Sequence, residues 1–150
     1  MKEILKIGFV GTAISPYFAE EQEVRKNSEV QLKKILENFD VELISFHKTI
    51  FSKEDSIEAE NLLKNKVDFL LIQTSSCSSG EQLYPLCNIS SKIGVWAVPD
   101  IEKEGGVKLH SLVSTSHYLG IIKKTLSDRK IKTKWFYNYA DTEEFKNKFL

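Results

Sequence analysis

The chain has 150 residues, of which 41% are apolar, and its 21 basic side chains balance its 21 acidic ones to give a formal net charge of zero. A neutral chain offers no electrostatic basis for binding nucleic acid or an anionic membrane, and no apolar run approaches the ~20 residues that span a bilayer. We therefore expect a single domain, residues 1–150, with no nucleic-acid and no membrane partner. The first residues lead into a strand pattern rather than a signal-peptide core, which favours a cytoplasmic location.

Five segments have the pattern of strands, because each is a short run rich in apolar or aromatic residues and bounded by turn residues. They are residues 6–12, 41–46, 67–73, 93–98 and 132–139. The third, Val67–Gln73, is an almost unbroken apolar run, which is typical of a strand covered on both faces. A helical pattern follows each strand, so the chain reads as five strand–helix repeats.

Capping signals predict where these helices begin. Ser15 is a candidate N-cap with Pro16 at the first helical position, while Ser52–Asp55 and Ser79–Gln82 have the spacing of capping boxes. Residues 141–144 give a similar signal before the last helix. The third helix is predicted over 79–88.

Apolar spacing predicts the buried faces of the helices. The predicted positions are Val24, Ile35, Leu36 and Phe39 in the first helix, Ile57, Leu62 and Leu63 in the second, Leu112, Thr115, Leu119, Ile122 and Leu126 in a fourth helix that follows His110, and Phe145 and Phe149 in the last.

Repeated strand–helix units predict an α/β fold with five parallel strands, because parallel neighbours require helical crossovers. The expected strand order is 2-1-3-4-5, which is a flavodoxin-like three-layer sandwich. In that order the chain reverses between the first and third strands, so a pocket is expected between residues 12–17 and 74–80, with Trp96, Pro99 and the loop to His117 on its third side.

The candidate substrate-binding residues are therefore Thr12, Tyr17, Ser75, Ser76, Trp96 and His117. All of these except Trp96 are expected to be accessible and close together, because only the carboxyl end of a covered parallel strand is open to solvent. Phe69, Leu71 and Val95 are expected to be buried. For Trp96 a place in the core is the alternative to a place in the site.

Several ligand classes fit the sequence poorly. The glycines at the end of the first strand lack the third glycine of the dinucleotide fingerprint, and no acidic residue follows the second strand to bind a ribose. A phospho-acceptor site would need acidic residues where Thr12 and Thr74 stand. The hydroxyls of Ser75–Ser79 are suited to cradling an anion, and the alternative is that they only satisfy the backbone of a turn.

Cys77 is a candidate nucleophile, because it precedes a predicted helix and His110 and His117 follow the neighbouring strand. A Cys77-dependent hydrolase is thus one hypothesis, although no nucleophile-elbow sequence and no orienting acid accompany the cysteine. Cys77 and Cys87 are expected to be reduced, and their spacing matches neither a zinc ligand pair nor a redox pair. The three histidines lack metal-ligand spacing, so no metal site is expected in this chain.

Four segments together resemble a known family. They are residues 67–80 (VDFLLIQTSSCSSG), 94–100 (GVWAVPD), Ser111-Leu112 and 134–137 (KWFY), and their order and spacing are similar to the amino-terminal domain of the L-fucose/L-arabinose isomerase family. The resemblance covers most of the chain. It implies a domain of an aldose–ketose isomerase that contributes oligomer contacts and one wall of a sugar site.

The resemblance also implies where the chemistry resides. Enzymes of this family use Mn²⁺ held by acidic residues and a histidine of later domains, so this chain is expected to bind no cofactor and to hold no catalytic residue. The implied partners are an aldose or ketose and either other copies of the chain or further domains of the same enzyme. A stand-alone sugar-binding or regulatory module without catalysis is the alternative.

Overall fold

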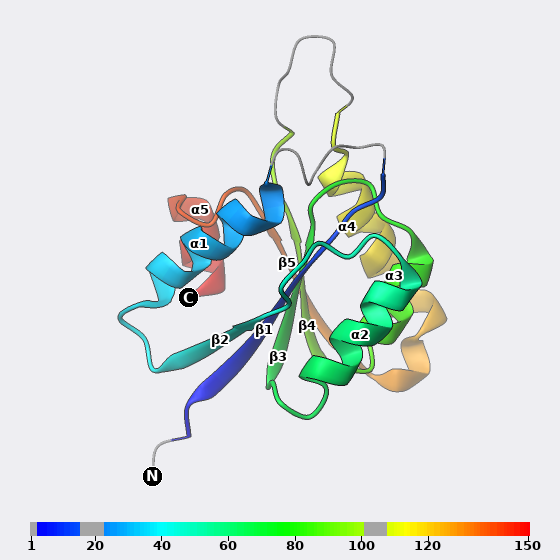
Figure 1. Cartoon of the computed structure of the whole chain (residues 1–150), viewed down its shortest axis with the longest axis horizontal. Coiled ribbons are helices and arrows are strands. Elements are labelled where there is room, and N and C mark those ends of the chain that lie inside the picture. Colours follow the sequence, from blue (N-terminus) through cyan, green and yellow to red (C-terminus); the bar gives the residue numbers. More distant parts are fainter. Residues whose placement is uncertain (1–2, 16–22, 101–107) are drawn as a thin grey trace.

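The computed structural model describes residues 3–15, 23–100 and 108–150, and its centre is a parallel five-stranded sheet (Figure 1). The strands are β1 (Leu5–Thr12), β2 (Val41–Ser45), β3 (Phe69–Thr74), β4 (Lys92–Ala97) and β5 (Lys132–Tyr137). Their order is β2-β1-β3-β4-β5, as the sequence predicted. Because the chain reverses direction across the sheet between β1 and β3, the carboxyl ends of these two strands mark the topological switch point.

Helices cover both faces of the sheet, which gives the three layers of a flavodoxin-like α/β fold (Figure 1). One face carries α1 (Val24–Leu36) and α5 (Glu143–Phe149). The other carries α2 (Lys53–Leu63), α3 (Gly80–Leu86) and α4 (Ser111–Gly120), and α4 continues into a π-helical turn, η1 (Ile121–Thr125), and a 3₁₀ turn, η2 (Ser127–Arg129). In the part of the chain that the structure describes, none of these helices has both the length and the apolar character to cross a membrane.

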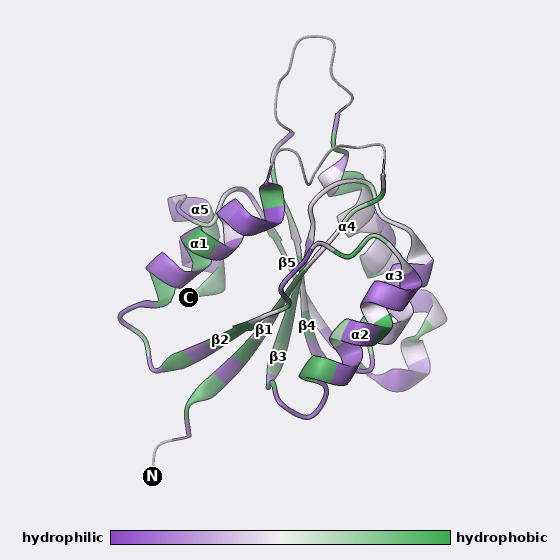
Figure 2. Cartoon of the chain, in the orientation of Figure 1, coloured by the Kyte–Doolittle hydropathy of each residue, from purple (hydrophilic) through white to green (hydrophobic). Residues whose placement is uncertain are grey.

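Successive side chains of a strand point to opposite faces of the sheet, so the core has two halves, one on each face. On β3, Leu71 packs toward α1 and α5, whereas Leu70 and Ile72 pack toward α2, α3 and α4. Apolar residues dominate the strands in the middle of the molecule (Figure 2). The stack of Phe145 on Phe149, with ring centroids 5.1 Å apart, confirms the predicted apolar face of the last helix.

The predicted caps of α2 and α3 are confirmed, whereas α5 is capped one residue after the start of the predicted segment 141–144. Ser52 Oγ accepts a hydrogen bond from the backbone N–H of Asp55 at the start of α2. Gln82 Oε1 accepts from the N–H of Ser79 in the capping box of α3, and Thr142 caps α5. The predicted start at Pro16 lies outside the described residues, and α1 as described begins at Val24.

For three helices, some of the residues that apolar spacing predicted to be buried are exposed. In α2 the buried residues are Ser56, Ala59 and Leu63, whereas Ile57 and Leu62 are exposed. In α4 Leu112 is 48% exposed, and in the segment after α1 Phe39 is also 48% exposed. In α2 and α4, small side chains such as Ser56, Ala59, Ser111 and Ser114 take up much of the buried face, which leaves some of the larger apolar residues in water.

Candidate functional site

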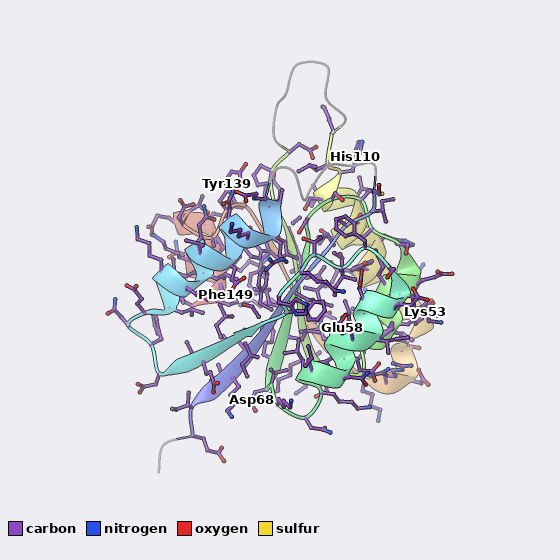
Figure 3. The ribbon with its side chains drawn as sticks, viewed as in Figure 1. Lys53, Glu58, Asp68, His110, Tyr139 and Phe149 are labelled. Atoms are coloured by element: carbon purple, nitrogen blue, oxygen red, sulfur yellow. The ribbon has the colours of Figure 1, made fainter. Side chains whose placement is uncertain are left out.

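Polar side chains gather at the carboxyl edge of the sheet, where β1 and β3 end side by side. Thr12 and Thr74 are register partners at the last position of these strands. Residues 75–79 then cross this edge toward α3, and α4 begins beside them at Ser111. In Figure 3 the labelled His110 lies at this edge of the sheet, and the labelled Asp68 lies at the opposite edge. The described residues of the segments predicted to line a pocket therefore lie at the switch point of the sheet.

Thr74 connects β3 to the first turns of α4. Its Oγ1 donates to the carbonyl oxygen of Ser111 at 2.8 Å and lies 2.8 Å from Oγ1 of Thr115. Ser111 Oγ in turn accepts from the N–H of Val98 at 2.9 Å and donates to the carbonyl oxygen of Thr74. All four residues are at least 97% buried, so these hydroxyls bind protein groups and not solvent.

A second set of hydroxyl bonds fixes the loop after β3. Thr12 Oγ1 and Ser78 Oγ are 2.9 Å apart, and the N–H of Ser78 donates to Ser114 Oγ at 2.8 Å. Ser78 Oγ donates to the carbonyl oxygen of Ser76. Gln82 Nε2 reaches across to the carbonyl oxygen of Ala13 at 2.8 Å. The loop is thus tied to β1, α3 and α4 together.

At the same edge, but on the face of the sheet that α1 covers, lie the side chains of Arg25 and Gln73. Gln73 Nε2 donates to Ser28 Oγ at 2.6 Å, and Gln73 Oε1 accepts from Ser75 Oγ at 2.9 Å. Arg25 packs against Gly11 so closely that a Cβ at Gly11 would lie 2.6 Å from Arg25 Cγ. Glycine is therefore required at the end of β1 because of this contact.

Arg25 is nearly buried and is held by charge and by carbonyl groups. Its guanidinium bonds Oε2 of Glu29 at 2.9 Å and the carbonyl oxygens of Phe46 and His47, while its Nε has no partner among the described residues. Burial opposes ionisation of Glu29, but hydrogen bonds from Lys33 and Arg25 outweigh it and hold the pKa of Glu29 below its ordinary value. These contacts attach α1 to the carboxyl end of β2.

The prediction that the candidate residues are accessible is wrong for most of them. Thr12, Ser75 and Ser76 are 0% exposed, because their hydroxyls serve the loop and the strand ends. Trp96 is also fully buried, with Nε1 donating to the carbonyl oxygen of Asn138, so the alternative of a core residue holds. Tyr17 lies outside the described residues.

The predicted burial of strand residues is confirmed for Leu71 and Val95, which are 0% exposed. Phe69 is only partly buried, because it stands at the first position of β3, where the helices of this face no longer cover the sheet.

The side chains that do reach the surface at this edge are few. His117 is exposed and adjoins α3, since a Cβ at Gly80 would lie 3.6 Å from His117 Nε2. Ser79 is exposed and Cys77 is half-buried, with its N–H donating to the carbonyl oxygen of Leu109. Of the six candidate binding residues, the structure therefore places only His117 within reach of a ligand among the described residues.

Most residues of the network were not among the six candidates, including Gln82, Ser111 and Ser114. A signal for the last two was present in the sequence, since Ser111, Ser114, Thr115 and Tyr118 recur at helical spacing and form the buried face of α4. Burial raises the pKa of the Tyr118 hydroxyl, which donates to the carbonyl oxygen of Ser79.

The chemistry available at this edge is that of a neutral, rigid polar wall. Within the described ranges no three or more His, Cys, Asp and Glu side chains are grouped so as to hold a metal ion. Cys87 lies in the core, where burial raises the pKa of its thiol to about 12. No family model and no curated protein matches the chain.

Proposed function

We propose that the chain is a non-catalytic α/β domain of a cytoplasmic aldose–ketose isomerase of the L-fucose/L-arabinose isomerase type. In this proposal its carboxyl edge forms one wall of a sugar site, and other domains or subunits form the rest. The observation that carries the proposal is the hydroxyl network, which holds residues 75–79 and the start of α4 in one fixed arrangement at the switch point.

A fixed neutral wall suits a sugar better than it suits an ion. Sugars are uncharged and hydroxyl-rich, so they are bound by backbone groups, hydroxyls and imidazoles arranged in advance. The groups available are the exposed Ser79 and His117, the half-buried Cys77 and the backbone of Gly80. Because the serines and threonines beneath them are already paired, they would position this surface and would not touch the sugar.

The proposal assigns the metal to other parts of the enzyme. Mn²⁺ prefers several carboxylate or imidazole ligands. The described residues offer no group of three or more such ligands at this edge. The chain's own role would be to bind and orient the sugar and to contact neighbouring subunits or domains.

The test is a titration of L-fucose and L-arabinose into the ¹⁵N-labelled chain, followed by amide shifts. We expect weak, saturable shifts at Cys77, Gly80 and His117, with affinity in the millimolar range, since most of the sugar would remain in water. His117→Ala should remove the shifts. Ser116→Ala, an exposed neighbour on the same helix, should leave them unchanged.

Two outcomes would contradict the proposal. If no amide at this edge shifts, the edge is not a sugar wall. If binding is tight and independent of metal, the chain is a stand-alone sugar-binding module and not one wall of a larger site. The hypothesis of a Cys77-dependent hydrolase stays a prediction, and its test by alkylation is given below.

A further inference from the structure

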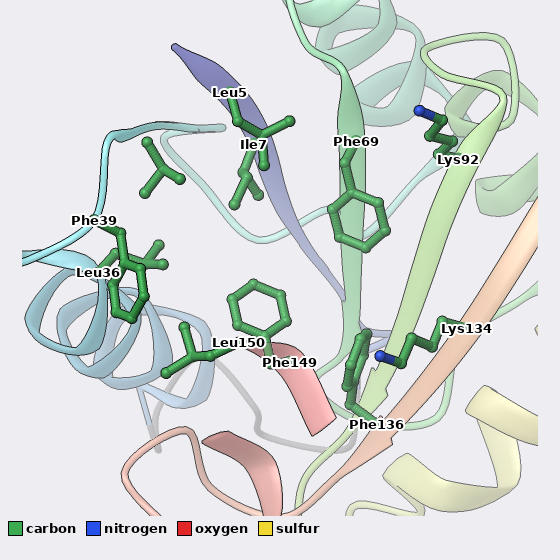
Figure 4. Close-up of a pocket in the computed structure, with 11 residues that line it drawn as sticks. Leu5, Ile7, Leu36, Phe39, Phe69, Lys92, Lys134, Phe136, Phe149 and Leu150 are labelled. Carbon is green, nitrogen blue, oxygen red and sulfur yellow. The ribbon is translucent and has the colours of Figure 1, made fainter. Parts of the chain in front are cut away.

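The opposite edge of the sheet, at the amino ends of the strands, holds an apolar cavity that the proposed function does not use (Figure 4). Its volume is about 450 Å³, which lies within the usual range for sites of small molecules. The lining comes from α1, α5, the segment after α1 and all five strands: Leu5, Ile7, Leu36, Phe39, Val41, Phe69, Lys92, Lys134, Phe136, Phe149 and Leu150.

The cavity has a buried floor and an exposed mouth. Ile7, Leu36 and Phe136 are at most 7% exposed and belong to the core beneath α1 and α5. Leu5 and Phe39 are 46% and 48% exposed, respectively. Apolar side chains left in water at the mouth of a buried apolar space are a favourable place for an aliphatic chain, because its burial would remove both surfaces from water.

Among the described residues that line the cavity, the only charged side chains are those of two lysines, Lys92 and Lys134. Lys92 and Lys134 lie on the same side of the cavity, on β4 and β5, and no Asp or Glu is among the lining residues (Figure 4). Lys134 Nζ stands 5.5 Å from the ring centroid of Phe136 and donates to the carbonyl oxygen of Lys148. An ammonium group carries three N–H donors, so two donors of Lys134 remain for a ligand. Lys92 is exposed.

We propose that this cavity binds a free fatty acid, with the alkyl chain among the apolar residues and the carboxylate between Lys92 and Lys134. An apolar lining with two cations at one side selects an aliphatic chain that ends in an anion. A neutral sugar would leave its hydroxyls unpaired against Ile7, Leu36 and Phe149. A cationic amphiphile would bring its charge against the two lysines.

The test is calorimetric titration of the full 150-residue chain with dodecanoate below its micelle concentration. We expect one site, and amide shifts at Phe69 and Lys134. Butyrate, which has the carboxylate without the long chain, and dodecyltrimethylammonium, which has the chain with the opposite charge, should bind at least about tenfold more weakly.

Two variants and a matched control locate the site. Lys92→Glu should weaken dodecanoate binding about five- to tenfold, because it replaces an attraction with a repulsion at an exposed position. Lys123→Glu makes the same charge change on η1, beyond the opposite face of the sheet, and should leave the affinity within about twofold. Leu5→Trp narrows the mouth with an apolar side chain and should also weaken binding.

Circular dichroism and denaturant unfolding would show that each variant is folded. Equal affinities for dodecanoate and dodecyltrimethylammonium would overturn the proposal, and so would equal effects of Lys92→Glu and Lys123→Glu. If dodecanoate does not bind and Leu5→Trp changes the molecular mass in light scattering, the cavity is part of an interface between copies of the chain and the proposal is wrong. A negative result here leaves the sugar titration unaffected, because the two sites lie at opposite edges of the sheet.

Discussion

The two edges of the sheet differ in how they use their side chains. At the carboxyl edge, hydroxyls and amides are abundant but are buried and paired with one another, as Thr74, Ser111 and Ser78 show. At the amino edge the side chains are mostly apolar, yet they leave a cavity of about 450 Å³ with an open mouth. A polar composition therefore does not by itself identify a ligand site.

The difference has a physical cause. A buried hydroxyl without a partner is costly, so a polar edge that is covered by a loop and a helix must pair its groups internally. Apolar side chains have no such requirement, and a space among them persists wherever the covering helices are short.

The largest effect concerns the thiols. Cys77, half-buried at the carboxyl edge, should react with iodoacetamide at neutral pH, whereas Cys87 should react about a hundredfold more slowly, because burial raises the pKa of its thiol to about 12. Peptide mass spectrometry after timed alkylation measures both rates. A Cys77 that reacts no faster than free cysteine would remove the support for the hydrolase hypothesis, and an esterase or amidase activity lost in Cys77→Ala would establish it.

The next effect concerns the paired hydroxyls. Ser111→Ala should lower the free energy of unfolding by about 2–3 kcal/mol, because it leaves the N–H of Val98 and the carbonyl of Thr74 without this partner in a dry site. Ser116→Ala, which removes an exposed hydroxyl bonded to the carbonyl of Leu112, should change the same quantity by less than about 0.5 kcal/mol. Urea unfolding measures both. Equal changes in unfolding free energy for the two variants would mean that the hydroxyl network contributes little to stability.

A third comparison adds one methylene group at each edge. Val98→Ile, at a site that is 3% exposed, should cost about 1 kcal/mol of unfolding free energy, because the carboxyl edge has no room for it. Val41→Ile, on the wall of the cavity, should be neutral or stabilising by a few tenths of a kcal/mol. Thermal unfolding measures the change in stability of both variants. If Val41→Ile were more destabilising than Val98→Ile, the result would show that the cavity closes in solution.

The smallest effect is a pH dependence at the carboxyl edge. Because the pKa of Glu29 is lower in the folded chain than its ordinary value, its ionised form stabilises the fold above that ordinary value, and the stabilisation is lost as the pH falls through the folded-state pKa. In Glu29→Gln the free energy of unfolding should therefore fall less steeply as the pH is lowered. Glu42→Gln removes an exposed ion pair of 3.7 Å with Lys6 and serves as the control, which should keep the steeper curve.

The fold could be predicted from the sequence because each strand was a short run rich in apolar or aromatic residues and three of the helices began at a capping signal. Ser52 and Ser79 cap their helices as predicted, and Thr142, within the predicted segment 141–144, caps the last one. The strand order is one of the common orders of doubly wound sheets, which right-handed helical crossovers allow. Local chemistry and topology were sufficient for this level of description.

For the candidate site, the position of its residues in the fold could be predicted from the sequence, but their accessibility could not. The switch point was correct, yet the accessibility of Thr12, Ser75 and Ser76 was not, since the partners of a hydroxyl depend on tertiary neighbours. Ser111 lies thirty-seven residues from Thr74 in the chain and becomes its partner only after β4 and α4 have formed. The amino-edge cavity could not be predicted at all, because empty space depends on how far α1 and α5 extend over the strands.

The position of β3 also bears on how the chain reaches its native state. β1 pairs with β2 early in the chain, but its other edge stays open until β3 arrives, with Phe9 opposite Leu71. Such non-local pairing slows folding, so we expect milliseconds to seconds rather than microseconds. During that interval the edge of β1 that will pair with β3 is open to pairing with another chain. Conditions that favour rapid formation of β3 should therefore also reduce aggregation during refolding.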